Sequence, residues 1–480
     1  MATVSETHEC EWKDEADKLR SENGALKHRL EKLEKAVFGR KSEKLPRVRD
    51  ELQAGAPKPR EETLKERSEK RAAKDALPER IIRHEVPAAK RRCPKCGSDD
   101  LRALGEGKRT VVYEYVPARL EKQVHVQQTL ACRCGEGIVT AEAPKAIEKG
   151  QYGPGLIAHV VTAKCLDSIP LYRQSKALER AGVPVARTTL GDLFHAAAGL
   201  TEPLYKRLLE LIKEEPYVRA DETPQRVLAK GKTRRAYVWT FRTEKLIAYV
   251  HSHGRSGDIP VEVLGGTTGY LQVDAYSGYN AVTLPHGRVR VGCWAHVRRK
   301  FHEALSTAPE AQAMLDLILE LYRIEHEVGL AGERGTASHL ERRKKDSAAV
   351  LERIKVWLET ELPKHPPKSP LGEAIRYARN QWEALARVCE DAGLALDNNA
   401  SERALRTIAL GRKNYLFVGT DEAGENLAGL FSLLATCEAN GVNPEEYIRD
   451  ILPRLHTHPN SRLDDLLPHR WQPQVAPDSS

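Results

Sequence analysis

The chain has 480 residues, of which 40% are hydrophobic and 30% charged, so it is not a wholly disordered protein and we expect roughly three or four domains. No apolar run approaches the ~20 residues of a membrane helix, and the acidic N-terminus does not resemble a signal peptide, which predicts a cytoplasmic protein. The net charge of +8 is modest, and nine cysteines are too few for a disulfide scaffold.

Residues 1–45 are predicted to form a coiled-coil helix that links two or more copies of the chain. Apolar residues recur every seven positions at Trp12, Leu19, Leu26 and Leu33. A second series, offset by four residues, contains Asn23, a polar residue typical of two-stranded coils. The alternative is a single amphipathic helix packed on its own protein. Residues 46–85 are rich in Lys, Arg, Glu and Pro and are predicted to be a linker.

Residues 86–145 are predicted to form a small zinc-ribbon-like module. Two cysteine pairs, joined by β-rich stretches at 111–116 and 124–130, provide the four thiolates of a closed tetrahedral site: Cys93, Cys96, Cys132 and Cys134. The C-x-C spacing of the second pair is the less common one, and His84 or His125 is an alternative ligand. The other interpretation is four unpaired buried cysteines.

Residues 146–213 are predicted to be helical and to contain a helix-turn-helix. One helix is expected over 171–181 and a second over 186–198, with Gly182 in the break and Thr188 or Thr189 available as a cap. Three basic side chains are candidate phosphate contacts: Arg173, Lys176 and Arg187. Most helix pairs of this kind are packing units, which is the alternative interpretation.

Residues 214–302 change to a strand-rich pattern. Strands are expected at 217–221, 235–242, 245–251, 269–274 and 289–294, with a short helix at 259–264 after the third strand. This is the element order of a ribonuclease-H-like α/β domain. A helical insertion is predicted at 303–393, the last part of the domain at 394–455, and a flexible C-terminal tail at 456–480.

Three acids occupy positions that such a sheet would bring together. Asp221 and Asp274 each end a predicted strand, and Glu402 lies near the start of a helix that Asp397 is placed to cap. Clustered carboxylates suit Mg²⁺ or Mn²⁺, and two such ions can assist attack on a phosphodiester. Taken singly, each acid has a structural alternative: a turn cap for either aspartate, or a pair with Arg406 for the glutamate.

Two basic stretches without acids, 275–302 and 403–420, indicate a polyanionic partner, most simply DNA, although a solvated basic face is the alternative. The candidate DNA contacts in these stretches are His296, Arg298, Arg299, Lys300, Arg406, Arg412 and Lys413.

Five motifs of this sequence resemble the large transposase of the insertion-sequence-66 family. They begin at Phe38, Ala220, Gln272, Cys293 and Asp397, and read FGRKSEK, ADETP, QVDAYSGY, CWAHVRRKF and DNNASERA. They occur in the same order as in that family, from the coiled coil to about residue 453.

The resemblance implies a DDE transposase with Asp221, Asp274 and Glu402 as its metal-binding triad. It also implies a zinc-finger-like module, recognition of the terminal inverted repeats of a bacterial element, target DNA, nucleoid association and small accessory proteins. Two other functions remain open at this point: a structure-selective nuclease of the same fold, and a catalytically inert coiled-coil zinc regulator that binds DNA.

Overall fold

The structure is a computed structural model that describes residues 121–131, 138–140, 146–147, 150–283, 285 and 287–474, with a few isolated positions before residue 121. Most of the predicted coiled coil and of the linker, and all four zinc-ligand cysteines, lie outside the described residues. A short antiparallel hairpin joins β1 (Thr129–Ala131) to β2 (Ile138–Thr140). The strand predicted from residue 124 is therefore too long, because residues 121–128 have no regular structure and are exposed.

Three helices precede the sheet: α4 (Pro154–Cys165), α5 (Leu171–Arg180) and α6 (Arg187–Glu214). Gly182 has a φ of +83°, a conformation that glycine adopts without strain, and it ends α5 as predicted. Neither threonine caps α6, since its N-cap is Ala186 and makes no side-chain hydrogen bond. The helix also continues past residue 198, because one face stays apolar and buried through Leu208.

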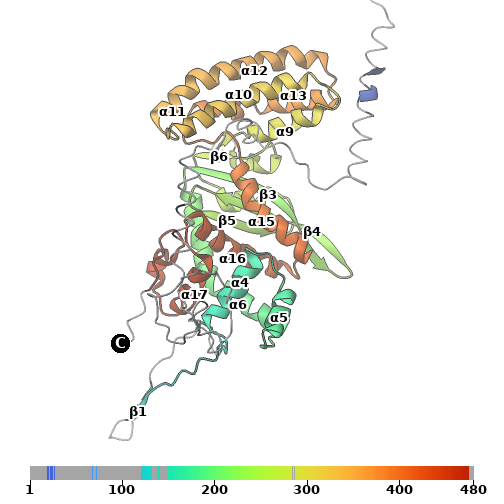
Figure 1. Cartoon of the computed structure of the whole chain (residues 1–480). Coiled ribbons are helices and arrows are strands. Elements are labelled where there is room, and N and C mark those ends of the chain that lie inside the picture. The colour runs from blue at the N-terminus through green and yellow to red at the C-terminus, as the bar shows by residue number, and fades with distance from the viewer. Residues whose placement is uncertain are drawn as a thin grey trace, which may run out of the picture. The chain divides into compact units, whose positions relative to one another are not determined.

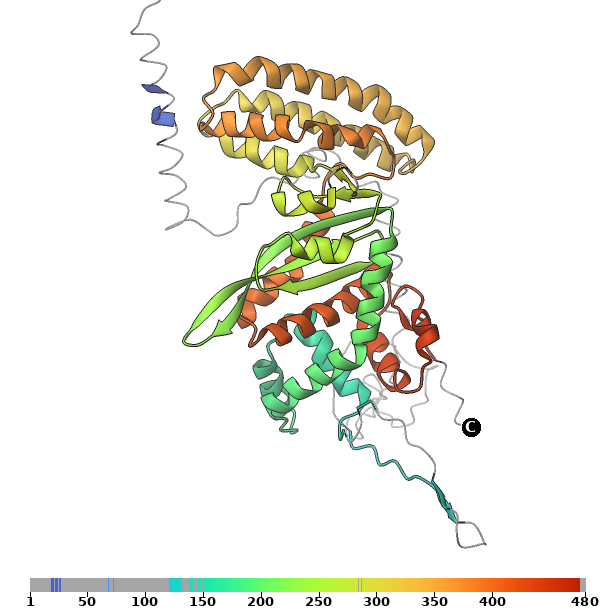
Figure 2. The same ribbon diagram turned by 180° about the vertical axis from the view of Figure 1, so that it is seen from behind.

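A five-stranded sheet forms the centre of the following region. Its strands are β3 (Tyr217–Ala229), β4 (Lys232–Arg242), β5 (Ile247–Ser252), β6 (Tyr270–Gln272) and β7 (Val289–Val291). The spatial order is β5-β4-β3-β6-β7, antiparallel through β5, β4 and β3 and parallel through β3, β6 and β7. Figure 2 shows how far the long β3–β4 hairpin extends. Helix α7 (Asp258–Leu264) leads toward β6, and a turn Ser277–Tyr279 with α8 (Asn280–Thr283) leads toward β7.

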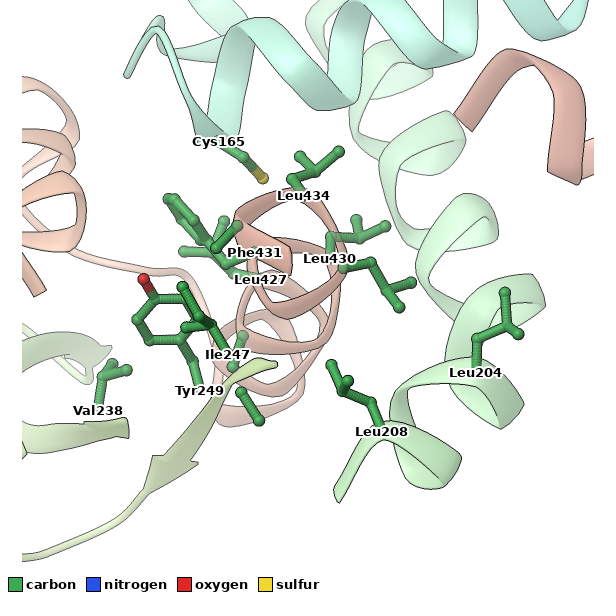
Figure 3. Packing of buried hydrophobic residues seen from close by; sticks show 14 of the residues in the cluster. Cys165, Leu204, Leu208, Val238, Ile247, Tyr249, Leu427, Leu430, Phe431 and Leu434 are labelled. Atoms are coloured by element: carbon green, nitrogen blue, oxygen red, sulfur yellow. The ribbon is translucent and has the colours of Figure 1, made fainter. Parts of the chain in front are cut away.

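The main hydrophobic core lies where α16 (Asp421–Ala439) packs between β5 and α6 (Figure 3). Leu430 and Phe431 are at most 1% exposed and lie among apolar side chains of both partners. Hydroxyl groups of the helix also bind the edge strand: the N–H of Tyr249 donates to Ser432 Oγ at 2.8 Å, and that of Ile247 to Thr436 Oγ1 at 3.1 Å. The helix therefore buries apolar surface and satisfies an otherwise open sheet edge.

Along the chain, a helical bundle lies between β7 and the helix that bears Glu402, and Figure 1 labels its helices α9 to α13. It contains α9 (Trp294–Ala304), α10 (Ala311–Leu330), α11 (Ala337–Arg342), α12 (Ala348–Glu361), α13 (Pro370–Asn380) and α14 (Trp382–Ala386). The bundle has a hydrophobic core of its own. Between α11 and α12, Arg343 is 1% exposed, and it pairs with both carboxylate oxygens of Glu325 at 2.7 and 2.9 Å.

After α15 (Asn399–Tyr415) and α16, the chain ends in α17 (Pro444–Arg454) and a short 3-10 segment, Asn460–Leu466. The prediction of a flexible tail from residue 456 is wrong for the described part. Leu466 and Leu467 are fully buried, and Asp464 pairs with Arg207 at 2.7 Å. Two leucines in a polar segment give little hydrophobic periodicity, which is why the sequence did not indicate this packing. Within the described part of the chain, no helix is both long and apolar enough to cross a membrane.

Removing the side chain of Leu430 should test the role of the α16 core. We expect Leu430→Ala to lower the free energy of unfolding by about 2–5 kcal/mol, because it leaves a cavity in a closely packed region. Leu410→Ala is the matched control, since Leu410 is 51% exposed and its truncation should cost less than ~0.5 kcal/mol. Denaturant unfolding followed by circular dichroism measures both values. Equal losses would show that α16 is not the main packing element.

Candidate active site

Parallel pairing of β3 with β6 brings Asp221 and Asp274 to neighbouring positions. The pairing ends at Arg219 and Gln272, and each aspartate follows its strand's last paired residue by two positions. Gln272 is fully buried, and its amide nitrogen donates to the carbonyl oxygens of Gly292 at 3.0 Å and Ala395 at 2.7 Å. The end of β6 is thereby tied both to the segment after β7 and to the segment that leads into α15.

The two aspartates occupy different local structures. Asp221 does not end its strand as predicted, because β3 continues to Ala229 by pairing with β4, and Asp221 lies opposite Thr240. Asp274 lies two residues beyond β6, and its Oδ1 accepts a hydrogen bond from the backbone N–H of Tyr276 at 2.9 Å. This turn formed by an aspartate side chain competes with strand pairing and explains why β6 stops early.

Glu402 lies in the first turn of α15, and the segment before it is fastened to β3. The Asn398 side chain is buried, and its Nδ2 donates to the carbonyl oxygen of Ala220 at 2.7 Å. Ala220 directly precedes Asp221, so one amide group links the helix that bears the glutamate to the strand that bears the first aspartate. Arg242 of β4 supports the same turn by donating to the carbonyl oxygen of Ala400 at 3.0 Å.

Asp397 was predicted to cap α15, whereas the N-cap residue is Asn398. The Asp397 carboxylate nevertheless accepts the backbone N–H of Asn399 at 3.0 Å, which satisfies one of the free donors at the helix start. Its other oxygen accepts the hydroxyl of Tyr322 at 2.8 Å. Tyr322 belongs to α10, so this contact joins the helical bundle to the start of the α15 helix.

The three acids are close enough to affect one another electrostatically. Burial, as the largest cause, together with the negative charges of Glu222, Asp274 and Glu402, raises the pKa of Asp221 to about 8, against the opposing effect of a hydrogen bond from the backbone N–H of Glu222. A carboxyl group with this environment holds its proton near neutral pH unless positive charge is supplied. The arrangement therefore favours the binding of cations at this end of the sheet.

Glu402 pairs with a cation on α9 rather than with Arg406. Arg299 lies 3.2 Å from both of its carboxylate oxygens, and His296 Nε2 lies 3.8 Å from one of them. Burial lowers the pKa of His296 below its ordinary value, and this effect exceeds the opposing influence of Asp274 and Glu402. At neutral pH the imidazole is thus uncharged, and Arg299 is the charge that balances Glu402.

In this arrangement the acids surround a common region without forming a closed ligand set. Among the described residues, no group of three or more His, Cys, Asp or Glu side chains is placed so that it could hold a metal ion. Glu402 is 27% exposed and directed to Arg299, so it must leave this arginine to join the aspartates.

Glu222 is a fourth acid at this site. It belongs to the ADETP motif, and no role was predicted for it. Its side chain is 2% exposed, it pairs with Arg255, and its second oxygen accepts the hydroxyl of Tyr279 at 2.6 Å. Burial raises its pKa above the ordinary value. In the sequence, only its position next to Asp221 indicated a role for Glu222. Its two partners, Arg255 and Tyr279, lie 33 and 57 residues away in sequence.

The basic residues predicted to contact DNA differ in their surroundings. Arg173, Lys176 and Arg187 are exposed on α5 and α6, and Arg406 and Lys413 are exposed on α15.

The remaining candidates are partly engaged within the protein. Lys300 lies over the Tyr377 ring at 4.8 Å from its centre. Arg412 donates to Thr223 Oγ1 at 3.2 Å and to the carbonyl of Pro224, which fixes α15 against β3. Arg298 is only 7% exposed, so its assignment as a DNA contact is wrong: its face of α9 points into the bundle.

Comparisons with known proteins match most of the chain to one family. Residues 149–426 match the model described as Transposase IS66 family, residues 432–469 match the IS66 C-terminal element, and residues 90–135 match the zinc-finger binding domain of transposase IS66. The last range contains all four predicted zinc-ligand cysteines.

Curated relatives from Sinorhizobium fredii are also similar. The uncharacterized protein y4qI is 34% identical over 421 residues, covering 83% of this chain and 76% of the relative. The uncharacterized protein y4jD is 31% identical over 423 residues, covering 82% and 81%.

The raised pKa of Asp221 predicts a pH-dependent stability. Between about pH 4 and pH 8 the unfolded chain has lost this proton while the folded protein keeps it, so the free energy of unfolding should fall as pH rises. Asp221→Asn removes the ionisation, and in EDTA it should raise the melting temperature by several degrees at pH 8.5 and by almost nothing at pH 4. The exposed Asp192, changed to Asn, is the control. If the difference in melting temperature between Asp221→Asn and the unmodified protein were the same at every pH, the assignment would be contradicted.

Proposed function

The chain belongs to the IS66 transposase family, and from this premise we propose that it is a DDE-type DNA transposase. In this proposal Asp221, Asp274 and Glu402 hold Mg²⁺ or Mn²⁺ and act on phosphodiester bonds at the ends of a mobile element. The observation that supports it most directly is the mutual electrostatic influence of these three acids, which come from separate elements of the chain.

The strand order supports a ribonuclease-H-like domain. If the sheet strands are counted along the chain, the spatial order β5-β4-β3-β6-β7 is 3-2-1-4-5, with only the second strand antiparallel to its neighbours. The first and fourth strands are then adjacent, and they are the strands that position Asp221 and Asp274. In this proposal the helical bundle is an insertion before the last catalytic helix.

The residues fit a divalent cation by the chemistry of their donors. Carboxylate oxygens are the ligands that Mg²⁺ prefers, and the repulsion at Asp221 is the condition that a cation relieves. When bound, paired divalent ions activate an attacking hydroxyl or water and stabilise the leaving 3′ oxygen. The protein supplies the framework: β3 and β6 fix the two aspartates, Asn398 fixes the start of the glutamate's helix, and Arg299 holds Glu402 until it joins them.

We propose the remaining properties from family membership. They are recognition of the terminal inverted repeats, binding of target DNA, self-association through the N-terminal coiled coil, cooperation with small accessory proteins of the same element, and action in the bacterial cytoplasm at the nucleoid. The exposed basic residues on α5, α6 and α15 are the surfaces available to DNA phosphates.

Substitution of the acids should separate catalysis from binding. With DNA that contains the inverted repeats flanking the gene, we expect Asp274→Ala and Glu402→Gln to reduce end cleavage and joining by on the order of 10³-fold. Binding of the ends should change by less than about threefold, because neither carboxylate is assigned to phosphates.

Glu303→Gln is the control, since Glu303 is an exposed acid on α9. Normal joining by Glu402→Gln would overturn the triad. Cleavage of branched DNA with no preference for the repeats would instead favour the structure-selective nuclease. If neither acid variant lost any activity and the protein still bound DNA specifically, the inert regulator would be favoured.

The zinc module makes a separate prediction. Elemental analysis of the purified protein should find about one zinc per chain, because four thiolates complete one tetrahedral site. Cys96→Ser should lower the zinc content to well below one, whereas Cys437→Ser should leave it unchanged, since Cys437 is a buried free cysteine of α16. Equal zinc content in both variants would show that the match over residues 90–135 does not mark a metal site here.

A further inference from the structure

A cleft lies between the edge strand β7 and the helical bundle, beside the region of the three acids. Its volume is about 680 Å³, and its walls come from β7 on one side and from α12, α13 and α14 on the other. The bundle covers the edge of β7 next to the cleft, because the N–H of Gly292 donates to the carbonyl of Ala384 and Arg387 donates to the carbonyl of Arg290, each at 2.8 Å. The exposed backbone of β7 is therefore already satisfied there, and a ligand must be recognised by the side chains.

Those side chains are predominantly cationic. Five cations line the cleft, Arg288, Arg290, Lys355, Arg379 and Arg387, against two acids, Glu359 and Glu383. Of these cations, Arg288 is engaged with the backbone carbonyls of Lys213 and Glu215. Lys355 and Arg379 are exposed, and no partner for either side chain is present among the residues that the structure describes. Two unpaired cations on adjacent helices that line the same cleft are suited to binding an anionic ligand.

Arg290 connects the cleft to the acids. Its Nη2 donates to the carbonyl oxygen of Tyr276 at 3.1 Å, in the turn that follows Asp274. Its Nε is buried and has no hydrogen-bond partner among the residues that the structure describes, so one donor of this lining residue is unsatisfied. A buried donor without a partner is unfavourable, and a ligand oxygen at this position would satisfy it.

The cleft also contains an aromatic surface. Trp382 is half-buried, and its ring meets Trp294 edge to face with centres 6.5 Å apart, an arrangement that fixes the indole at the wall. Amide side chains of Asn280, Asn380 and Gln381 lie around the same space. Cations, an aromatic plane and neutral amides are together the groups that bind the phosphate, the base face and the base edge of a nucleotide.

From these features we infer that the cleft binds one unpaired nucleotide of a DNA strand, with its phosphate at Lys355 and Arg379 and its base at Trp382. The volume is in the range that encloses one small molecule and does not admit a duplex. This inference rests on the proposed function for the identity of the polymer. It adds a second contact, linked to the turn after Asp274 through Arg290, that would hold the strand while the acids act on it.

The test uses the full-length protein and a fluorescein-labelled 20-nucleotide dT oligonucleotide that contains 4-thiothymidine. We expect the double variant Lys355→Gln/Arg379→Gln to weaken binding by about tenfold and to reduce the slope of log affinity against log salt by about 0.7, since the two side chains share one phosphate and each phosphate neutralised on a single strand contributes ~0.7. The control is Arg323→Gln/Lys345→Gln, which removes the same charge from exposed residues of the bundle outside the cleft and should change neither quantity appreciably.

Photocrosslinking gives a local measurement. In the unmodified protein the crosslinked peptide should contain Trp382, and the double variant should lose that crosslink. Equal affinities and salt slopes for the double variant and its control, or crosslinks that map only elsewhere, would overturn the inference. The Asp274→Ala variant separates the two proposals: it should bind and crosslink normally without cleaving DNA. Cleavage by Asp274→Ala with an intact crosslink would overturn the proposed function and leave the cleft assignment standing.

Discussion

Repulsion between carboxylates that the backbone forces together is the constraint on which this site depends. Asp221 and Asp274 cannot move apart without breaking the parallel register of β3 and β6, and the start of the Glu402 helix cannot retreat without breaking the Asn398 amide contact to Ala220. The cost is visible in the pKa of Asp221, which burial and neighbouring acids raise to about 8. A fold that holds a buried carboxyl group next to other acids favours the binding of a cation, since a positive charge would relieve these unfavourable interactions.

The helical bundle is bound closely to this framework. Tyr322 of α10 donates to Asp397, and Gly292, directly after β7, donates to the carbonyl of Ala384. These contacts surround the two points at which the bundle joins the sheet. A displacement of the bundle would therefore be transmitted to the start of α15, and with it to Glu402. The bundle is in a position to influence the site as well as to contribute the wall of the cleft.

Much of the sheet was predictable because its strands consist of β-branched and aromatic residues between clear turns, and all five predicted strands are present. The boundaries were less predictable: β3 runs on past Asp221 because β4 remains paired with it, a tertiary effect without a local signal. The three acids stood out because two were expected at strand ends and the third at a helix start, although β3 in fact continues past Asp221. Gln272, Asn398 and Tyr322 were not given roles, since their partners lie 20 to 178 residues away and polar residues of these types are common in loops.

Both edges of the sheet are closed by side chains or helices, and this limits where a long polymer can bind. At β5 the hydroxyls of Ser432 and Thr436 take the free backbone groups, and at β7 the segment around Ala384 does so. Strand addition at either edge is thereby disfavoured, because few unpaired backbone donors remain there.

The end of the sheet near Asp274 is different, since it combines acids that need cations with Arg290, a cation that still has a free donor. Under the proposed function, a phosphodiester strand would suit both groups, with the acids holding divalent ions and the arginine facing a phosphate. Clustered acids and an unsatisfied cationic donor in one place together favour a nucleic acid at this end, and neither feature by itself would be sufficient.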